Sequence, residues 1–380
     1  MRLITSGQGP RLQKPVFGMV ILLLSSWALV AEEGFEEGAV ELRSIGALSF
    51  SPEGVLFIAD PAGAAIFALE TSGHKSSSGT PQEIPDLHSR VASFLGTEPK
   101  RTLIHDLAVH PLSNWIYLSV SRGSYSSNYL ATQVESGAVP ALLRMDFKGQ
   151  MEEVALEKVR YSMASIDRPP DSGAKLWGIP SRTFTITDLE FSDGELLVAG
   201  LSNQEFSSRL YRLPFPFGPQ ASALPVEVYH TSHGRYETHA PIRALIPLKV
   251  GSEPMVVAAY TCTPLVVFPV SQLRGEGRIR GKTVAELGPR NTPLDLATYR
   301  EGGADYLLVA NNRHPLMRLK LGEIATAEPM VEQSKRGGAA AQRLELRGVR
   351  RMTRINDSQV LAIQRVDGLD RLIVLSGGNL

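Results

Sequence analysis

The sequence is poor in cysteine, in aromatic residues and in net charge. A single cysteine, Cys262, among 380 residues means that no disulfide can form within the chain, so its core must stabilise the fold. The 39 lysines and arginines equal the 39 aspartates and glutamates, which leaves no global field to attract nucleic acid or an anionic membrane. Aromatic residues make up only 7%, without the basic and aromatic stripe that binds single-stranded nucleic acid. The composition therefore predicts no nucleic-acid partner.

Familiar catalytic motifs are also absent. The sequence has no G-x-S-x-G, Walker loop, C-x-x-C-H or H-E-x-x-H motif, so no pattern in it fixes a reaction. The glycine-rich stretch from Gly275 to Gly281 has the wrong glycine spacing for a dinucleotide site. Function must therefore be approached through architecture.

One long apolar run is present, from Val16 to Ala31, between a basic N-terminal region and an acidic stretch. This order predicts a secretory signal peptide over residues 1–31, cleaved after Ala28 or Ala31. The alternative is a membrane anchor, but the run is shorter than the roughly 20 residues that span a bilayer. The mature chain, 32–380, is expected in a periplasm or outside the cell, without a transmembrane segment. Its single cysteine is compatible with a bacterial periplasm.

A pattern of three short apolar segments recurs six times in the mature chain. The first segments begin 59, 82, 56, 51 and 53 residues apart, at Ile45, Ile104, Ile186, Ile242, Pro293 and Leu346. Second apolar segments begin at Val55, Trp115, Glu195, Pro254, Asp305 and Gln359, and a third segment follows each of them. Turn residues, as in SPEG from Ser51 to Gly54, separate the first two segments.

These repeats predict an all-β, six-bladed β-propeller over residues 32–380. Each unit has room for four short strands, and six such sheets arranged radially bury one another's faces. A sandwich or two smaller all-β domains is the alternative, disfavoured because no linker interrupts the repeats. The last unit has three strands before Leu380, so we expect the segment from Gly38 to Ser44 to complete it and close the ring.

Two insertions interrupt the regular repeat. Between the first two units, Leu87, Val91 and Leu95 have helical spacing and Asp86 is placed as a cap, which predicts a short helix packing on the first blade. The second unit carries two polar segments, 121–138 and 166–183, which are expected to be loops over one face.

The segment from Ile186 to Gly200, ITDLEFSDGELLVAG, resembles six-bladed propellers of the NHL, YWTD and SMP-30/gluconolactonase kind. The resemblance covers essentially Gly38 to Leu380 and concerns fold rather than activity.

In a propeller, loops joining second to third strands share one face with the connections from fourth strands to the next first strands, and ligands usually bind there. This rule predicts a ligand-binding face that gathers residues distant in sequence. Its expected members are His233, Arg235, Tyr236, His239, Asn203, Glu205, Cys262, Asn311, Asn312 and His314. Glu237 belongs to the same connection as the two histidines.

Three aspartates occupy equivalent positions of the first segments: Asp106, Asp188 and Asp295. If they converge on the axis they would repel one another unless they share a cation, which makes Ca²⁺ or another divalent ion the candidate cofactor. The alternative, which we favour, is that each aspartate accepts hydrogen bonds from backbone amides of its own blade.

The resemblance to SMP-30 enzymes implies a catalytic cation held by Glu, Asn and Asp side chains near this mouth. Asn203 and either Asn311 or Asn312 are similar in placement to those ligands. The residues before the aligned aspartates, His105, Thr187 and Leu294, depart from the pattern because none is asparagine, so the implied ligand set is incomplete.

The segment from Tyr229 to Leu245 holds three histidines in an H-x2-H-x5-H spacing, which matches no established metal motif. Alternation with Val226 and Val228 places His230 on a strand, which leaves His233 and His239 as candidate ligands or acid/base groups. With His314 or His105 they form a possible Zn²⁺ or Cu²⁺ donor set. Cys262 is expected to be a small buried hydrophobe rather than a nucleophile.

Three functions remain open from the sequence. The first is an exported binding module for a small molecule, glycan or protein partner at the ligand-binding face. The second is a metal-dependent hydrolase, lactonase- or esterase-like, with the three aspartates as cation ligands. The third is a redox enzyme with a quinone cofactor, which related propellers host.

Overall fold

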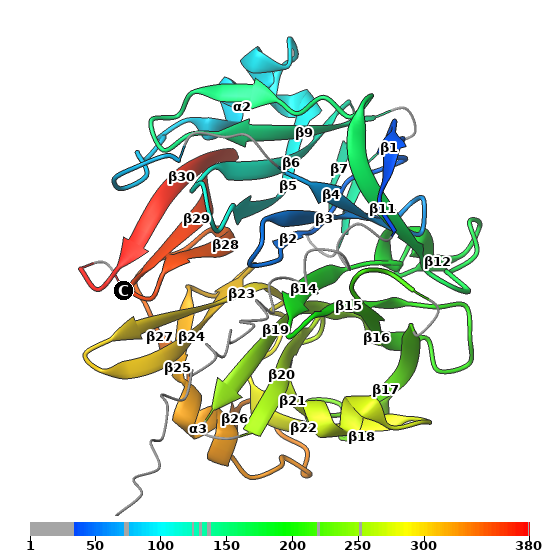
Figure 1. The fold of residues 1–380 in the computed structure, drawn as a ribbon. Helices are drawn as coiled ribbons and strands as arrows, with labels where there is room; N and C mark the ends of the chain where they lie inside the picture. The colour runs from blue at the N-terminus through cyan, green and yellow to red at the C-terminus, as the bar shows by residue number, and fades with distance from the viewer. Residues whose placement is uncertain are drawn as a thin grey trace, which may run out of the picture. The chain divides into compact units, whose positions relative to one another are not determined.

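A computed structural model describes residues 34–71, 76–123, 125–128, 131–134, 138–218, 221–250, 253–378 and 380. The predicted signal peptide lies outside these residues. The described chain is all-β, with several twisted sheets arranged in a propeller-like way (Figure 1). None of its helices has the length and apolar character needed to cross a membrane.

The first segments of all six repeats form inner strands, as predicted. They are β2 (Leu48–Phe50), β5 (Thr102–Val109), β14 (Asp188–Ser192), β19 (Ile242–Val250), β23 (Pro293–Glu301) and β28 (Val349–Asn356). In four of them the pairing register shifts near the start of the strand, at His105, Arg243, Leu294 and Arg350. Such bulges redirect side chains, and here they bring charged groups close to the aligned aspartates.

The second segments form strands that are almost entirely buried, because sheets cover both of their faces. They are β3 (Val55–Asp60), β6 (Ile116–Arg122), β15 (Glu195–Leu201), β20 (Glu253–Tyr260), β24 (Ala304–Asn311) and β29 (Gln359–Val366). The third segments pair antiparallel with them as β4 (Ala65–Glu70), β9 (Val139–Met145), β16 (Ser208–Pro214), β21 (Pro264–Pro269), β25 (Met317–Lys320) and β30 (Leu369–Ser376).

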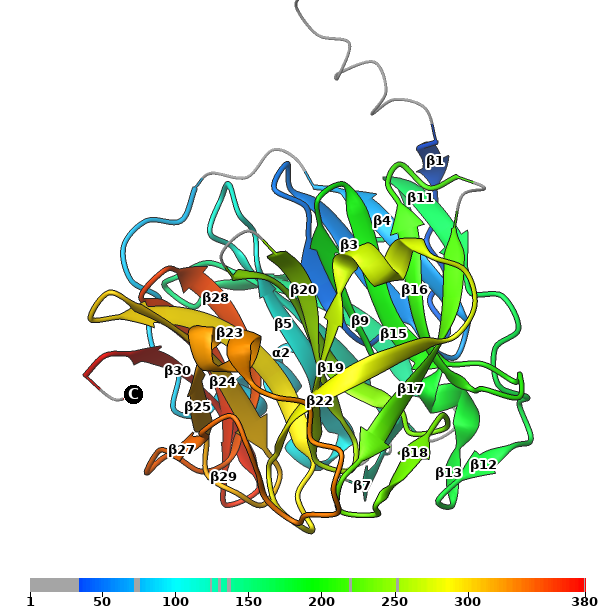
Figure 2. The ribbon, with the colours of Figure 1, turned by 90° about the horizontal axis from the view of Figure 1, so that it is seen from below.

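Outer strands cover the third strands of five repeats. They are β11 (Val159–Ser165), β10 (Met151–Glu153), β17 (Ser222–His230), β22 (Ile279–Glu286) and β27 (Gln342–Arg343). β17 also pairs in parallel with β22, which joins the third and fourth sheets into one ten-stranded sheet (Figure 2).

The remaining elements are short and lie mostly in the connections. They are β1 (Glu36–Gly38), α2 (Leu87–Phe94), η1 (Pro99–Arg101), β7 (Tyr125–Asn128), β8 (Ala131–Val134), β12 (Lys175–Leu176), β13 (Ile179–Pro180), η2 (Ser181–Phe184), β18 (Arg235–Glu237), η3 (Val270–Arg274), α3 (Leu321–Thr326) and β26 (Gly337–Gly338). The two segments predicted as loops in the second repeat thus contain the small ladders β7–β8 and β12–β13.

The inner strands contact one another in a closed cycle whose order is not the order of the chain. β2 contacts both β5 and β14, β14 contacts β19, β19 contacts β23, β23 contacts β28, and β28 contacts β5. The second sheet therefore lies between the first and the last, as the colours in Figure 1 show. The chain completes this exchange when β11, which follows the second sheet, returns to pair with β4 of the first.

The prediction that an N-terminal strand from Gly38 to Ser44 completes the last sheet is wrong. β1 covers Glu36–Gly38 and pairs with β11 in the first sheet. The edge of β30 is instead met by Ile84, whose N–H donates to the Leu372 carbonyl at 3.0 Å and whose carbonyl accepts from Leu372 at 2.9 Å. The reason is the exchanged order: the chain passes the free edge of the last sheet on its way to the second.

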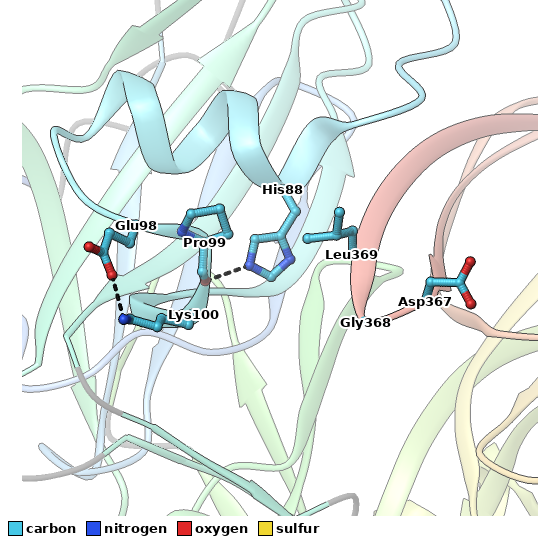
Figure 3. A pocket seen from close by; sticks show the side chains of 7 residues that line it. All are labelled: His88, Glu98, Pro99, Lys100, Asp367, Gly368 and Leu369. Atoms are coloured by element: carbon cyan, nitrogen blue, oxygen red, sulfur yellow. Dashed lines mark hydrogen bonds and ion pairs between the residues drawn. The ribbon is translucent and has the colours of Figure 1, made fainter.

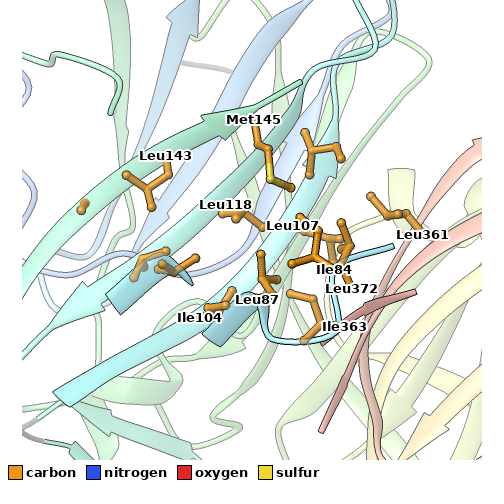
Figure 4. Packing of buried hydrophobic residues seen from close by; sticks show 14 of the residues in the cluster. Ile84, Leu87, Ile104, Leu107, Leu118, Leu143, Met145, Leu361, Ile363 and Leu372 are labelled. Carbon is orange, nitrogen blue, oxygen red and sulfur yellow. The ribbon is translucent and has the colours of Figure 1, made fainter. Parts of the chain in front are cut away.

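The core is divided among the interfaces between neighbouring sheets. Six hydrophobic clusters each combine residues of two sheets that adjoin in the cycle. Figure 4 shows the cluster between the second and last sheets, where Leu107 and Leu118 pack near Leu361 and Leu372. Each sheet thus buries both faces only through its two neighbours.

The predicted helix is confirmed as α2, with Asp86 as its N-cap accepting from the Ser89 N–H at 3.0 Å. Leu87 and Val91 are fully buried. The predicted packing on the first sheet is wrong, because these side chains belong to the cluster between the second and last sheets. The helix follows Ile84, which the last sheet holds in place.

Candidate functional site

A tight hairpin after β17 builds the most concentrated group of potential ligand atoms. β17 ends at His230, whose carbonyl accepts from the N–H groups of His233 (3.1 Å) and Gly234 (2.8 Å). Gly234 has a φ of +64°, a left-handed conformation that glycine adopts without strain. β18 then pairs back on β17 and brings Glu237 diagonally opposite His230 on one face of the hairpin.

Two imidazoles share one carboxylate in this hairpin. His230 Nδ1 lies 2.9 Å from Glu237 Oε2, and His233 Nδ1 lies 2.7 Å from Glu237 Oε1. The two rings are 3.9 Å apart between centroids. We call His230, His233 and Glu237 the histidine–glutamate cluster. Among the described residues, only these three histidine, cysteine or acidic side chains have ligand atoms that all lie within 4.8 Å of one another.

The cluster runs from the interior to the surface. His230 is 1% exposed, whereas the side chains of Glu237 and His233 are 15% and 46% exposed. Burial alone would raise the pKa of Glu237, but hydrogen bonds from His230 and His233 hold that pKa down at about 2. Glu237 is therefore an anion at neutral pH, and both Nδ1 atoms donate to it.

A second carboxylate and the lone cysteine adjoin the cluster. Glu286 is 4% exposed, and its Oε2 accepts from the Thr231 hydroxyl at 2.7 Å. Its Oε1 has no hydrogen bond of normal geometry, and burial raises the pKa of Glu286 although the hydroxyls of Thr263 and Thr231 lower it in part. Burial, together with the charges of Glu237 and Glu286, raises the pKa of Cys262 to about 11, so its thiol stays protonated and is a poor nucleophile.

The other residues of the predicted face fall into an exposed group and a structural group. Asn203, Glu205, Arg235, Tyr236 and His239 are exposed. Ser207 Oγ lies 3.1 Å from Nδ1 of His239, which couples this loop to the next.

Asn311 and Asn312 are taken up by the fold. The Asn311 amide donates to the Val309 carbonyl at 2.8 Å, and Asn312 Oδ1 accepts from the Thr292 N–H at 2.7 Å. His314 is half-buried, and burial followed by nearby arginine charges lowers its pKa. Its Nε2 is buried without a hydrogen bond, close to Gly288.

Each aligned aspartate accepts hydrogen bonds from backbone amides, which was the interpretation we favoured. We expected donors in the aspartate's own sheet, but the donor shared by all three cases lies in the neighbouring sheet. Asp106 accepts from the Leu48 N–H at 2.9 Å, Asp188 from Leu245 at 2.7 Å, and Asp295 from Met352 at 2.6 Å. Asp188 and Asp295 also accept from the next residue of their own strand. These bonds join three of the six pairs of adjoining sheets, and all three run in the same rotational sense around the cycle. Cation binding by the three aspartates stays a prediction.

Charged groups of both signs surround these aspartates. We call Asp106, Asp188, Asp295, Glu190, Arg243 and Arg351 the axial cluster. Burial, then the charge of Asp106, raises the pKa of Asp188 to about 7. Burial, and after it the charge of Asp188, raises the pKa of Glu190 well above its ordinary value. On the basic side, burial and the charge of Arg351 lower the pKa of Arg243 to about 9. Burial and arginine charges likewise lower the pKa of His105 to about 3, so that ring is neutral and not a free acid.

A cavity of about 510 Å³ lies apart from both clusters, between α2 and the turn that joins β29 to β30 (Figure 3). It is lined by His88, Glu98, Pro99, Lys100, Asp367, Gly368 and Leu369. His88 Nε2 donates to the Pro99 carbonyl at 2.8 Å and its Nδ1 lies 3.3 Å from the buried Asp370. Burial would lower the pKa of His88, but Asp370 and the Pro99 carbonyl raise it, and both ring nitrogens face these partners.

Sequence reasoning missed parts of both clusters. His230 was set aside as a strand residue, yet as the last residue of β17 it is buried and also reaches the loop. Glu237 was placed in the same connection as the histidines, but its contact with His230, seven residues earlier, depends on the tight turn between β17 and β18. Arg243, Arg351 and Glu190 gave no signal, because only packing around the axis brings them together.

Comparisons with known proteins assign no family. No protein-family profile matches the chain, and no curated protein matches it significantly in sequence. The extracellular domain of the one-component system BT4673 from B. thetaiotaomicron is similar in structure over 90% of this chain, with 12% identity and a TM-score of 0.35. This chain spans only 40% of that protein.

Two further solved structures have the same character. The plexin A4 extracellular region is 10% identical over 90% of this chain and 47% of its own, with a TM-score of 0.42. The PQQ-bound aldose sugar dehydrogenase of Streptomyces coelicolor is 15% identical over 90% and 96%, with a TM-score of 0.35. Similarities this low carry no argument about activity, so the description of the fold rests on the chain's own sheets.

Proposed function

We propose that residues 32–380 form an exported, six-bladed β-propeller that acts as a binding module for a small molecule, glycan or protein partner. The closed cycle of inner strands and the clusters between adjoining sheets support six blades in one domain. The apolar N-terminal run supports export.

The observation that carries a binding role is an exposed, braced aromatic side chain in the same hairpin as the histidine–glutamate cluster, on the other face of its strands. Tyr236 is 44% exposed, packs edge-on against Tyr229 at 5.2 Å, and has the Arg280 guanidinium 4.2 Å from its ring centroid. A tyrosine fixed in this way presents an apolar ring and a hydroxyl at little entropic cost, which suits sugar rings and peptide surfaces. Arg235 and His233 add exposed polar groups to the same hairpin, where both contact Glu237.

Binding can be tested with the purified protein on a glycan array and in a thermal-shift panel of small molecules. We expect a selective hit whose affinity falls at least about tenfold in Tyr236→Ala, because hot-spot tyrosines cost more than about 1.4 kcal/mol when truncated. His239→Ala, on the adjoining loop, is also expected to weaken capture, while both variants keep near wild-type thermal stability. The proposal is contradicted if both variants bind as wild type does, or if wild type binds no compound on the array or in the panel.

The second candidate is a metal-dependent hydrolase with a cation held by Asp106, Asp188 and Asp295. The crowding of acidic groups in the axial cluster favours it, since a cation would relieve their repulsion. Its support is weaker, because Asp188 and Asp295 already direct both carboxylate oxygens to backbone amides. Added Ca²⁺ should raise the thermal midpoint if this candidate holds, and an unchanged midpoint removes it.

A further inference from the structure

The histidine–glutamate cluster has the donor set of a transition-metal site rather than of a calcium site. Two imidazole nitrogens and one carboxylate oxygen suit Zn²⁺ and its neighbours in the first transition row, whereas Ca²⁺ and Mg²⁺ require mainly oxygen ligands. In His230 and His233 the nitrogen that faces Glu237 is Nδ1. The two nitrogens face different oxygens of the carboxylate, Oε2 and Oε1, and one ligand atom from each residue lies within 4.8 Å of the other two.

The spacing of these atoms is close to that of a coordinated ion. Zinc–nitrogen bonds of about 2.0–2.1 Å in tetrahedral geometry place neighbouring ligand atoms about 3.3 Å apart. The nitrogen–oxygen pairs here are 2.9 and 2.7 Å apart, each closed by a proton. Replacing both protons by one ion requires these atoms to separate by about half an ångström. His233 is half exposed and can make that movement, while buried His230 holds the position.

A second observation points the same way. His230 Nε2 lies 3.2 Å from the Cys262 carbonyl oxygen, which can only accept a hydrogen bond. Histidines that bind metal through one nitrogen typically donate the other N–H to a carbonyl or carboxylate, which fixes the ring. The Cys262 carbonyl can accept this N–H once His230 binds metal through Nδ1, and the Ser232 hydroxyl, 2.8 Å from the same Nε2, can also accept it.

The charge balance also favours a dication. The carboxylate of Glu237 faces both rings, and the buried carboxylate of Glu286, which accepts from the Thr231 hydroxyl next to His230, adds a second acidic group. An ion bound at His230, His233 and Glu237 would lower the electrostatic cost of both carboxylates. Because His233 is exposed, a fourth position remains open for water or a ligand atom.

We propose that His230, His233 and Glu237 bind one Zn²⁺ ion with an open coordination position toward solvent. This site lies on the proposed binding face, yet it does not rest on that function, because the metal can be measured without any organic ligand.

The test is a titration of the chelator-treated protein with Zn²⁺ alone, by calorimetry and by thermal shift. We expect one ion per chain and an increase in the thermal midpoint at saturating metal. His233→Ala should weaken zinc binding at least about tenfold and abolish that increase, because it removes a ligand from a half-exposed position. Ca²⁺ and Mg²⁺ should not compete at equal concentration.

His239→Ala is the matched control, since His239 is an exposed histidine of the same connection whose Nδ1 faces Ser207 instead. It should bind Zn²⁺ within about twofold of wild type. Glu237→Gln provides a second ligand variant and should also lose zinc. The proposal is overturned if wild type binds no zinc, if His233→Ala binds normally, or if His239→Ala loses as much. Loss of ligand capture in Tyr236→Ala with zinc retained would concern only the proposed function.

Discussion

The axial cluster makes the stability of the fold depend on pH in a way that one substitution should reveal. Asp188 is partly buried between two sheets, where burial and the charge of Asp106 raise its pKa to about 7 from an ordinary 3.8. A carboxyl whose pKa is higher in the folded state binds its proton more tightly there. The free energy of unfolding therefore falls as pH rises from about 4 to about 7 and is constant above that range.

The magnitude follows from the two pKa values. At about 1.4 kcal/mol for each pKa unit, the difference corresponds to at most roughly 4 kcal/mol over the whole range. Between pH 5 and pH 8 the same two values give about 2–3 kcal/mol. Asp188→Asn removes this titration and also lowers the pKa of Glu190 and Asp295, which the charge of Asp188 raises. The variant should therefore gain about 2 kcal/mol relative to wild type between pH 5 and pH 8.

Urea denaturation of both proteins at several pH values from 5 to 8 measures this difference. The decisive quantity is the slope of the free energy of unfolding against pH. The absolute stability also changes, because asparagine keeps only one of the two oxygens that accept from the Leu189 and Leu245 N–H groups. Asp305→Asn is the control, since its exposed carboxylate pairs with Arg300 and has a lowered pKa. Because it keeps Asp188, its stability should fall with pH as that of wild type does, and the difference between the two should not change above pH 5. Parallel profiles for wild type and Asp188→Asn, within roughly 0.5 kcal/mol, would refute the reasoning.

Two other substitutions test how the ring is held together. Ile84→Pro removes the N–H that donates to the Leu372 carbonyl at the edge of the last sheet, and should cost about 3 kcal/mol in urea denaturation, whereas Ile84→Val should cost about 1 kcal/mol. Equal effects would show that the edge pairing does not close the ring. Asp370→Asn leaves the Arg365 guanidinium without its buried carboxylate partner and weakens the contact with His88, and should cost about 3–5 kcal/mol at pH 7. A loss below roughly 1 kcal/mol would mean that solvent screens this pair.

The strands could be read from the sequence because they are local. Each first, second and third segment alternates or buries its residues over three to nine positions, and turn residues such as those at Asp193–Gly194 separate them. The same is true of α2, whose cap and apolar spacing lie within ten residues. These features depend on neighbours along the chain, which is why single-sequence reasoning identified them.

The candidate site was predicted only in part, and for a related reason. The topology of the repeat placed His233 and His239 on the loop side, but His230 was excluded because a strand was taken to direct it into the core. His230 is the last residue of β17, so its ring is buried like a strand residue and also reaches the turn. Its Nδ1 contacts Glu237 of the returning strand β18. Contacts across a turn of four residues depend on its backbone geometry, which residue types constrain only loosely.

By itself, the sequence determined that this chain folds into six repeated groups of short strands, because period-two patterns and turn residues act over a few positions. Only the tertiary structure decided that the second sheet lies between the first and the last, that Ile84 rather than the N-terminal strand meets β30, and that charges gather at the axis. The faces of all these sheets are similarly apolar, so their pattern cannot specify which neighbour each sheet takes. That choice depends on how the side chains of two sheets fit together when they pack.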